Sequence, residues 1–381
     1  MNGEQGTARA SYFYGTERAC APEETLARLL PLFDRVGITR LADVTQLDRL
    51  GVPTYQAVRP LARSLSVSQG KGLTPAAAKA SAVMESIELW HSETAEPASL
   101  VATVDEAERL TGYPAALLPL SQPSFLHPGL RVQWTQAVGV LSGRKSLVPT
   151  ALVVRDRRWT GTFSPPVFRT GSNGLAGGNN VAEATLHALF ELVERDSAER
   201  ARQSGTARAR PVDLASVTFE PCRAFSAKCE AEGVFFELFD LTGPTGVPVL
   251  YASVWSADLP VYFMGWGCHL NRDIAVARAF TEAAQSRLTA IAGARDDMEP
   301  VYHWARAVLR RPASSAQPRS YDSIPSHTAD GFISALRFLA GQVEALTGHE
   351  PLSVDLTRAD IAIPVVQLVA PGLMPHRRRG P

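Results

Sequence analysis

Residues Thr170 to Arg200 constrain the fold more than any other stretch, because a glycine-rich turn leads into a long helix-forming run: TGSNGLAGGNNVAEATLHALFELVERDSAER. Asn179 or Asn180 can cap the helix, since either side chain can accept hydrogen bonds from the free backbone N–H groups of the first turn. The stretch therefore predicts a tight turn followed directly by a long α-helix.

The predicted helix carries acidic side chains along one stripe. Glu183, Glu191 and Glu194 stand eight and then three residues apart, with His187 between them. An apolar face lies beside the stripe and consists of Leu186, Leu189, Phe190, Leu192 and Val193. Carboxylates next to a buried face are costly unless a cation or a solvated cleft compensates for them. The stripe therefore predicts a cleft that holds metal ions and a phosphate-bearing ligand.

The same design occurs twice more. Between Ser64 and Glu96, a glycine-containing loop with Lys71 precedes a helix that has Pro75 in its first turn and the polar stripe Ser81, Glu85, Glu88 and Ser92. The third copy has the loop GWGCH, Gly265 to His269, before a helix from Asp273 to Ala292 with the stripe Arg278, Glu282 and Gln285. We expect three helices to converge on one cleft and to lie over β-sheet.

The rest of the chain predicts a mixture of helices and strands. Strands are expected at Arg131–Leu141, Ser146–Val154, Val234–Thr242, Val247–Trp255 and Ile363–Val369, and further helices at Pro22–Val36 and about 331–346. These elements predict an α/β (mixed α+β) protein with a single domain over residues 19–373, which could divide into two subdomains. Residues 1–18 are expected to be a flexible lead-in and residues 374–381 a solvated basic tail.

Composition excludes several functional classes. The 381 residues are 45% apolar and 20% charged, as in ordinary globular proteins. Thirty-eight basic residues balance 38 acidic ones, so no overall field favours nucleic acid or an anionic membrane. No apolar run is long enough to span a bilayer, and the cysteines lack zinc-site spacing: Cys20, Cys222, Cys229 and Cys268. Because no secretory signal is present, we expect reduced thiols and a cytoplasmic protein.

Standard nucleotide-binding motifs are absent. A P-loop ending at Lys71 would need glycine at position 65 and Ser or Thr at 72, whereas the chain has Leu65 and Gly72. A dinucleotide G-x-G-x-x-G after a strand, a kinase catalytic loop, H-E-x-x-H and G-x-S-x-G are also missing. The carboxylate stripes remain, with basic residues near them in the pattern: Lys71, Arg195, Arg287 and Arg295. Mg²⁺ takes such oxygen ligands together with substrate phosphates, which suggests ATP with Mg²⁺; the alternative is that the carboxylates line solvated helix faces.

The three motifs resemble those of the YcaO family, ATP-dependent enzymes that activate backbone amides of peptides. The first motif of the family is similar to Gly70-Lys71-Gly72 with Ser81-x3-Glu85-x2-Glu88. The second is similar to Asn179-x3-Glu183-x7-Glu191-x2-Glu194-Arg195, and the third to Glu282-x2-Gln285-Ser286-Arg287 followed by Arg295-Asp296-Asp297. The resemblance extends from about Tyr14 to Leu373. It implies a YcaO-like fold in which sheet layers carry three motif helices around one ATP cleft.

The resemblance also implies a role for each motif residue. Mg²⁺ ligands would be Glu85, Glu88, Glu191 and Glu194. Nucleotide-binding residues would be Lys71, Ser81, Asn179, Glu183, Arg195, Gln285 and Arg287; of these, Lys71, Arg195 and Arg287 are the catalytic candidates because they would neutralise developing charge. His187 could act as a base, but we favour a supporting role for it. In the family's reaction a nucleophile adds to a backbone amide, the resulting oxygen attacks the γ-phosphate of ATP, and loss of phosphate leaves the new heteroatom on carbon.

The chain departs from the family pattern in two places. Many members have arginine after the last glutamate of the first motif, whereas Leu89 follows Glu88 here. Many azoline-forming members end in a proline-rich tail, whereas this chain ends in Pro371-Gly372-Leu373-Met374-Pro375 and then arginines. The segment Glu88-Leu89-Trp90-His91 and the third motif look most like the subgroup that works with TfuA proteins, which is linked to thioamide formation.

We therefore expect an ATP- and Mg²⁺-dependent enzyme that forms a thioamide in a ribosomally made precursor peptide or protein, with a TfuA-like partner that handles sulfur. The alternatives within the family are an azoline-forming cyclodehydratase and a macroamidine-forming enzyme. A non-catalytic nucleotide-binding scaffold is the alternative from another class. Because little chain precedes the first motif, a separate leader-binding protein is expected to help capture the substrate. A homodimer is also expected, and partners of nucleic acid or membrane type are not.

Overall fold

A computed structural model describes residues 9–156, 166–204, 209–295, 297 and 316–374. Its α-helices are α1 (Pro22–Leu29), α2 (Phe33–Val36), α3 (Pro75–Thr94), α4 (Val104–Thr111), α5 (Val181–Gln203), α6 (Glu220–Ala231), α7 (Arg272–Ala292) and α8 (Phe332–Thr347). Within these ranges, none of the helices has the length and apolar character needed to cross a membrane.

The described strands form antiparallel sheets. A hairpin joins β1 (Ser11–Phe13) to β2 (Thr16–Arg18), and a three-stranded sheet has the order β3 (Arg40–Asp43), β4 (Thr54–Val58), β5 (Val67–Lys71). A four-stranded sheet has the order β10 (Arg210–Pro211), β11 (Val234–Asp240), β12 (Val249–Ser256), β13 (Phe263–Cys268). A six-stranded sheet runs β6 (Ser99–Thr103), β7 (Arg131–Gly139), β14 (Leu352–Asp355), β15 (Val365–Val369), β9 (Leu175–Gly177), and β8 (Lys145–Pro149) also pairs with β7.

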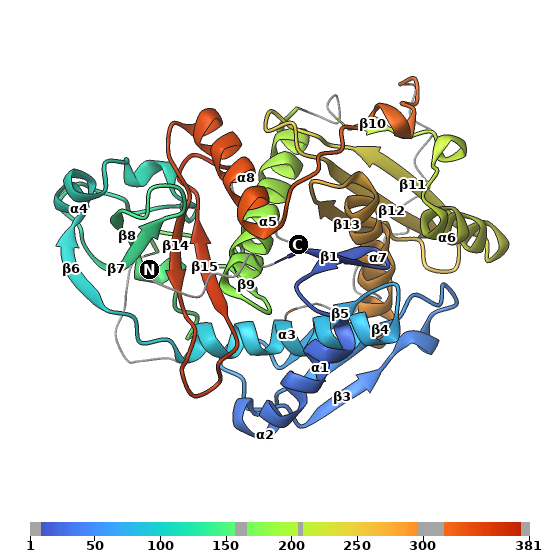
Figure 1. Cartoon of the computed structure of the whole chain (residues 1–381), viewed down its shortest axis with the longest axis horizontal. Coiled ribbons are helices and arrows are strands. Elements are labelled where there is room, and N and C mark those ends of the chain that lie inside the picture. The colour runs from blue at the N-terminus through green and yellow to red at the C-terminus, as the bar shows by residue number, and fades with distance from the viewer. Residues whose placement is uncertain (1–8, 157–165, 205–208, 296, 298–315, 375–381) are drawn as a thin grey trace.

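The two large sheets lie on opposite sides of α5, and the three-stranded sheet lies along one edge together with α3 (Figure 1). Three apolar clusters fill the interior. One connects α3 with the three-stranded and six-stranded sheets, a second lies between the four-stranded sheet and helices α6 and α7, and a third surrounds α5 and α8. The mixed α/β class that the sequence predicts is confirmed.

Three strand–helix units build the centre of the molecule: β5 leads into α3, β9 into α5 and β13 into α7. Within the described residues, each of these strands is the edge strand of its sheet, and the following helix packs on it. Glycine permits this close approach, because a Cβ on Gly70 would lie 2.0 Å from Ala82 N and one on Gly267 would lie 2.1 Å from Ala275 O. The loops predicted at Lys71 and at Gly265–His269 are therefore wrong for the most part, since strands β5 and β13 extend through Lys71 and Cys268.

The three motif helices share one register. Each begins at a side chain that accepts a first-turn N–H group, and these caps are Thr74, Asn180 and Asn271. Counted from the cap, positions 4 and 8 hold fully buried alanines in all three helices: Ala78, Ala82, Ala184, Ala188, Ala275 and Ala279. Positions 7, 11 and 14 carry the polar stripe, which is Ser81, Glu85 and Glu88 in α3, His187, Glu191 and Glu194 in α5, and Arg278, Glu282 and Gln285 in α7. The three stripes therefore occupy equivalent places.

Two further differences from the sequence-based expectation concern the first third of the chain. Residues 11–18 form the β1–β2 hairpin, where a flexible lead-in is expected, and the hairpin is tied down because Ala19 N donates to Glu183 Oε2 at 3.0 Å. Helix α4 is not predicted, although Thr103 and Glu106 form a capping box at its start. The basic tail after residue 374 and Asp296 lie outside the described residues.

Candidate functional site

Polar contacts join the three strand–helix units around one centre. Each pair of units shares at least one contact: Glu88 Oε1 accepts from Gly177 N at 2.6 Å, Lys71 Nζ donates to Glu282 Oε2 at 2.7 Å, and Arg278 Nη1 donates to His187 Nε2 at 3.0 Å. In Figure 1, α5 lies near the centre of the molecule, and α3 runs across the view below the labels of α5 and α7. The predicted convergence of the three motif helices is confirmed.

The positive charges near the carboxylates of α3 and α5 are too few to offset the effect of burial on their pKa values. Burial, together with repulsion from Glu85 and Glu191, raises the pKa of Glu88 to about 8. Burial also raises the pKa of Glu194 to about 7, although Arg195 opposes the shift, and it raises the pKa values of Glu85 and Glu191. The exposed side-chain fraction is 24% for Glu191 and 4% for Glu194, so solvent reaches Glu191 in part while Glu194 is buried. A cation bound there would stabilise their charged forms.

Glu282 holds the equivalent place in α7 but has a different environment. Burial opposes its charge, yet Lys71 and Arg195 outweigh burial and lower its pKa. The carboxylate is therefore already compensated by Lys71, whose Nζ lies 2.7 Å away.

Arg195 connects the carboxylates to the four-stranded sheet. Its Nη1 lies 3.4 Å from Glu194 and its Nη2 3.7 Å from Glu191. Its guanidinium also lies over the ring of Trp266 in β13, 5.8 Å from the centroid. The carboxylates of α5 and the indole ring of β13 therefore fix the position of the Arg195 guanidinium beside Glu191 and Glu194.

A second polar group lies at the start of α5. Asn179 Nδ2 lies 3.2 Å from both carboxylate oxygens of Glu183, and its Oδ1 accepts from Thr25 Oγ1 at 3.0 Å. Arg18 Nε, from strand β2, lies 3.7 Å from Glu183, which is 3% exposed. The positive charge of Arg18 also acts on Glu88, so this residue connects the second polar group with the carboxylates.

The structure places the remaining predicted residues differently. Ser81 is exposed and Gln285 is half-buried, each on its stripe. Arg295 donates to both oxygens of Asp297, at 2.9 and 2.8 Å, and its charge opposes the rise in the pKa of Glu85.

The structure does not bring Arg287 to this cluster, although it is predicted as a phosphate-neutralising residue. Its side chain is 2% exposed, its Nε lies 3.1–3.2 Å from both oxygens of Asp48, and its Nη1 donates to Ser256 Oγ at 2.8 Å. Arg287 stands five residues after Glu282, so the helical turn directs it to the other face of α7, against the sheet. Its contacts are those of a structural ion pair.

Sequence reasoning did not assign a site role to Arg18, Arg278 or Glu282. Arg278 and Glu282 carry a signal, because they stand at the same helical positions as His187 and Glu191. Arg18 carries no such signal, since its position depends on the fold of the β1–β2 hairpin.

The donor set fits Mg²⁺ with a phosphate-bearing nucleotide. Four glutamates from two helices carry the hard oxygen atoms that Mg²⁺ takes as ligands, and burial raises the pKa of each, so a nearby cation would stabilise their charged forms. Arg278 Nε is buried without a hydrogen-bond partner, so the cluster still offers a donor to an anion. Among the described residues no three acidic, histidine or cysteine side chains are close enough to hold a metal alone. Mg²⁺ commonly completes its shell with water and substrate phosphates.

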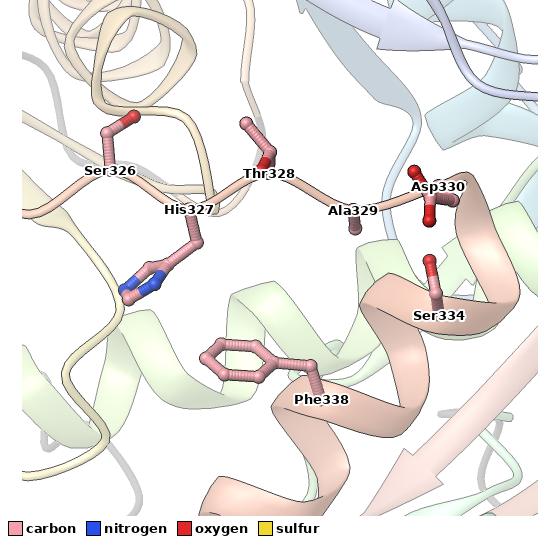
Figure 2. Close-up of a pocket in the computed structure, with 7 residues that line it drawn as sticks. All are labelled: Ser326, His327, Thr328, Ala329, Asp330, Ser334 and Phe338. Carbon is pink, nitrogen blue, oxygen red and sulfur yellow. The ribbon is translucent and has the colours of Figure 1, made fainter.

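Two hollows lie elsewhere on the surface. The larger, about 460 Å³, opens between the segment 326–330 and α8, where the ring of His327 faces that of Phe338 (Figure 2). The smaller, about 230 Å³, lies between α2 and the C-terminal end of α3 and includes Trp90 and Arg59. Neither hollow is lined by a predicted site residue.

Comparison with known sequences identifies relatives over most of the chain. Residues 69–374 match the family described as YcaO cyclodehydratase, ATP- and Mg²⁺-binding. An uncharacterised protein of Mycobacterium tuberculosis is 38% identical over 376 residues, covering 95% of this chain and 83% of the relative. A protein encoded in the tfuA 3′ region of Rhizobium leguminosarum bv. trifolii is 38% identical over 304 residues, covering 74% of this chain and 70% of the relative.

Solved structures share the fold. YcaO from Methanopyrus kandleri bound with AMPPCP and Mg²⁺ aligns with a TM-score of 0.75 at 23% identity, over 96% of this chain and 95% of that one. A heterocyclase in complex with substrate and cofactor aligns with a TM-score of 0.81 at 22% identity, over 98% of this chain. This chain spans only 54% of that heterocyclase. The matched family model and the relatives identify this chain as a member of the YcaO family, which binds ATP and Mg²⁺.

Proposed function

We propose that the protein uses ATP and Mg²⁺ to activate a peptide backbone amide by O-phosphorylation, and that the product is a thioamide in a ribosomally made peptide or protein. One observation carries this proposal: the three strand–helix units bring buried glutamates with raised pKa values together with Lys71, Arg195 and Arg278. An amide oxygen is a poor leaving group, and phosphate transfer to it supplies a good one; Mg²⁺ would stabilise the charge on the transferring group.

In this proposal the carboxylates and the cations have separate roles. Glu85, Glu88, Glu191 and Glu194 would hold the cations on the phosphates. Lys71, Arg195 and Arg278 would face the charge that develops on the transferring group, in a site where burial strengthens electrostatic interactions. Ser81, Asn179, Glu183 and Gln285 would bind the nucleotide by hydrogen bonds, and Arg18 would join Glu183 at the start of α5. We leave Arg287 out of this set because Asp48 and Ser256 hold it elsewhere.

Thioamide formation is favoured by the relative encoded beside tfuA, which is 38% identical to this chain. A TfuA-like protein would then supply sulfur, and a separate protein could present the substrate. Azoline formation is the second candidate, because the family is described as cyclodehydratase and a heterocyclase shares the fold. The related macroamidine reaction would use a peptide amine. A nucleotide-binding scaffold without chemistry would bind ATP but would not hydrolyse it in the presence of peptide.

Mass spectrometry of a co-produced substrate peptide tests the proposal. The peptide should be one encoded beside the gene, and the experiment should be run with and without the TfuA-like protein. Exchange of oxygen for sulfur makes the product heavier, whereas either cyclisation removes one water and makes it lighter. A lighter product would replace thioamide formation with cyclisation, and an unchanged peptide with no ATP turnover would favour the scaffold.

A further inference from the structure

The contact between His187 and Arg278 fixes the protonation state of the imidazole. Arg278 Nη1 lies 3.0 Å from His187 Nε2. A guanidinium can only donate hydrogen bonds, so His187 Nε2 accepts and carries no proton. The ring is therefore neutral, with its proton on Nδ1.

The surroundings of His187 oppose a second proton. Burial lowers its pKa well below the usual value, and the cations Arg278 of α7, Arg18 of β2 and Lys71 of β5 lower it further. His269 faces it from the turn before α7 and is itself neutral, because its Nδ1 accepts from Asn271 N at 3.0 Å and burial lowers its pKa to about 3. On its own helix, Glu183 and Glu191 stand four residues before and after His187. The imidazole is thus a neutral acceptor among cations.

The other cations of the cluster are held by carboxylates. Lys71 pairs with Glu282, Arg195 with Glu191 and Glu194, and Arg18 with Glu183. Arg278 makes no ion pair within 4.0 Å among the described residues, and its Nε is buried without a hydrogen-bond partner. A carboxylate in place of His187 would cancel much of the charge of Arg278, whereas a neutral acceptor fixes the guanidinium and leaves its charge available to an anion.

We propose that His187 is a positioning residue, whose neutral imidazole orients Arg278 so that the guanidinium charge faces the phosphates of the bound nucleotide. This inference rests on the proposed nucleotide site. It assigns His187 a role in phosphate binding and excludes the role of general base for it.

Three substitutions separate these roles, and the measurement is the Kd for AMPPCP in the presence of Mg²⁺ by titration calorimetry. His187→Gln keeps a neutral acceptor, so the Kd should stay within about threefold of that of the parent protein. His187→Leu removes the acceptor and should raise the Kd about tenfold or more. His187→Glu should raise it at least as much, because the carboxylate neutralises Arg278. His127→Leu, at an exposed histidine outside the cluster, is the matched control and should leave the Kd unchanged.

Thermal unfolding of each variant is measured first, and the His187→Gln and His187→Glu pair still decides the question if His187→Leu fails to fold. Equal affinity in the Gln and Glu variants would overturn the proposal. Loss of peptide-stimulated ATP hydrolysis in His187→Gln, with unchanged Kd, would also overturn it in favour of a general base. If the parent protein binds no AMPPCP with Mg²⁺, the proposed function fails together with this inference; if it binds and His187→Leu binds equally, only this inference fails.

A second readout does not depend on nucleotide. Nitrogen-15 NMR of the histidine rings in the nucleotide-free protein at pH 6 should show His187 as the neutral tautomer with its proton on Nδ1. An imidazolium signal for His187 at this pH would contradict the geometry from which the proposal follows.

Discussion

Lys71 Nζ lies 2.7 Å from Glu282 Oε2, although the two residues are 211 positions apart in the chain. Glu282 occupies the same helical position as Glu85 and Glu191, yet its pKa is lowered whereas theirs are raised. Lys71, whose Nζ pairs directly with Glu282, accounts for this difference together with Arg195, because their charges outweigh burial at Glu282, whereas the charge of Lys71 only partly opposes the effect of burial at Glu85. The metal ligands are therefore expected from α3 and α5, while α7 contributes cations and a paired acid.

Glu191→Gln or Glu194→Gln should abolish ATP turnover, with a loss of about a hundredfold or more, because each change removes a carboxylate charge that would hold Mg²⁺ on the phosphates. The unfolding temperature should stay close to that of the parent protein, since the amide keeps the shape of the side chain. Phosphate release in the presence of peptide is the measurement. Glu344→Gln, at an exposed acid of α8, is the control, and normal turnover in either site variant would refute the metal assignment.

The stability of the nucleotide-free protein should fall as pH rises from about 4.5 to 8. Glu88 has a pKa of about 8 in the folded protein, compared with about 4.3 in an unfolded chain. Between these values the folded state binds the proton more tightly, so the contribution of Glu88 is present below the lower value and is lost as pH approaches the upper one.

Glu88→Gln removes this contribution. Urea unfolding at pH 5.5 and pH 8 should therefore show a smaller loss of unfolding free energy in the variant than in the parent protein. The same pH dependence in both proteins would show that Glu88 is charged at neutral pH without a cation.

Binding of Mg²⁺ with nucleotide should release protons near pH 7. With pKa values of about 8 and about 7, Glu88 is mostly protonated and Glu194 about half protonated at this pH, and a bound cation would displace these protons. Calorimetric titrations with Mg²⁺ and AMPPCP in two buffers of different ionisation enthalpy measure the number of protons. Fewer protons should appear with Glu88→Gln, and an identical count in parent and variant would mean that the cation does not reach Glu88.

Gly70→Ala should destabilise the protein by about 1–3 kcal/mol or more, because the new methyl group would overlap Ala82 N and Ala78 O of α3. Gly341→Ala is the matched control, since no atom beyond its chain neighbours and the backbone of its own helix lies within 4 Å of the added Cβ in the middle of α8. That change should stabilise the protein by about 0.5–1 kcal/mol. Denaturant unfolding compares the two, and similar effects at both sites would contradict the close packing of α3 on β5.

The sequence predicts the three polar helices well, because their caps and their polar stripes are local features. It fails where one residue type serves two purposes. Glycine before a helix normally indicates a turn, but Gly70, Gly265 and Gly267 lie in strands and admit a helix backbone against them. Asn180 rather than Asn179 caps α5, and Asn179 instead binds Glu183.

Of the site residues that the sequence did not predict, Arg18 depends on contacts between distant segments. Arg18 reaches the cluster because the β1–β2 hairpin folds back on α5, which local pattern does not reveal. Arg287 shows the converse, since its place in the third motif suggests a phosphate ligand, while Asp48, the residue with which it pairs, lies 239 residues earlier in the chain.

A structure determined with Mg²⁺ and AMPPCP would show directly where the nucleotide and the metal ions bind. We expect the phosphates to be enclosed by α3, α5 and α7, with Mg²⁺ at about 2.1 Å from carboxylate oxygens of Glu85, Glu88, Glu191 and Glu194 and with Arg278 turned toward phosphate. Nucleotide bound elsewhere, for example in the hollow beside Phe338, with no cation on these glutamates, would contradict this expectation.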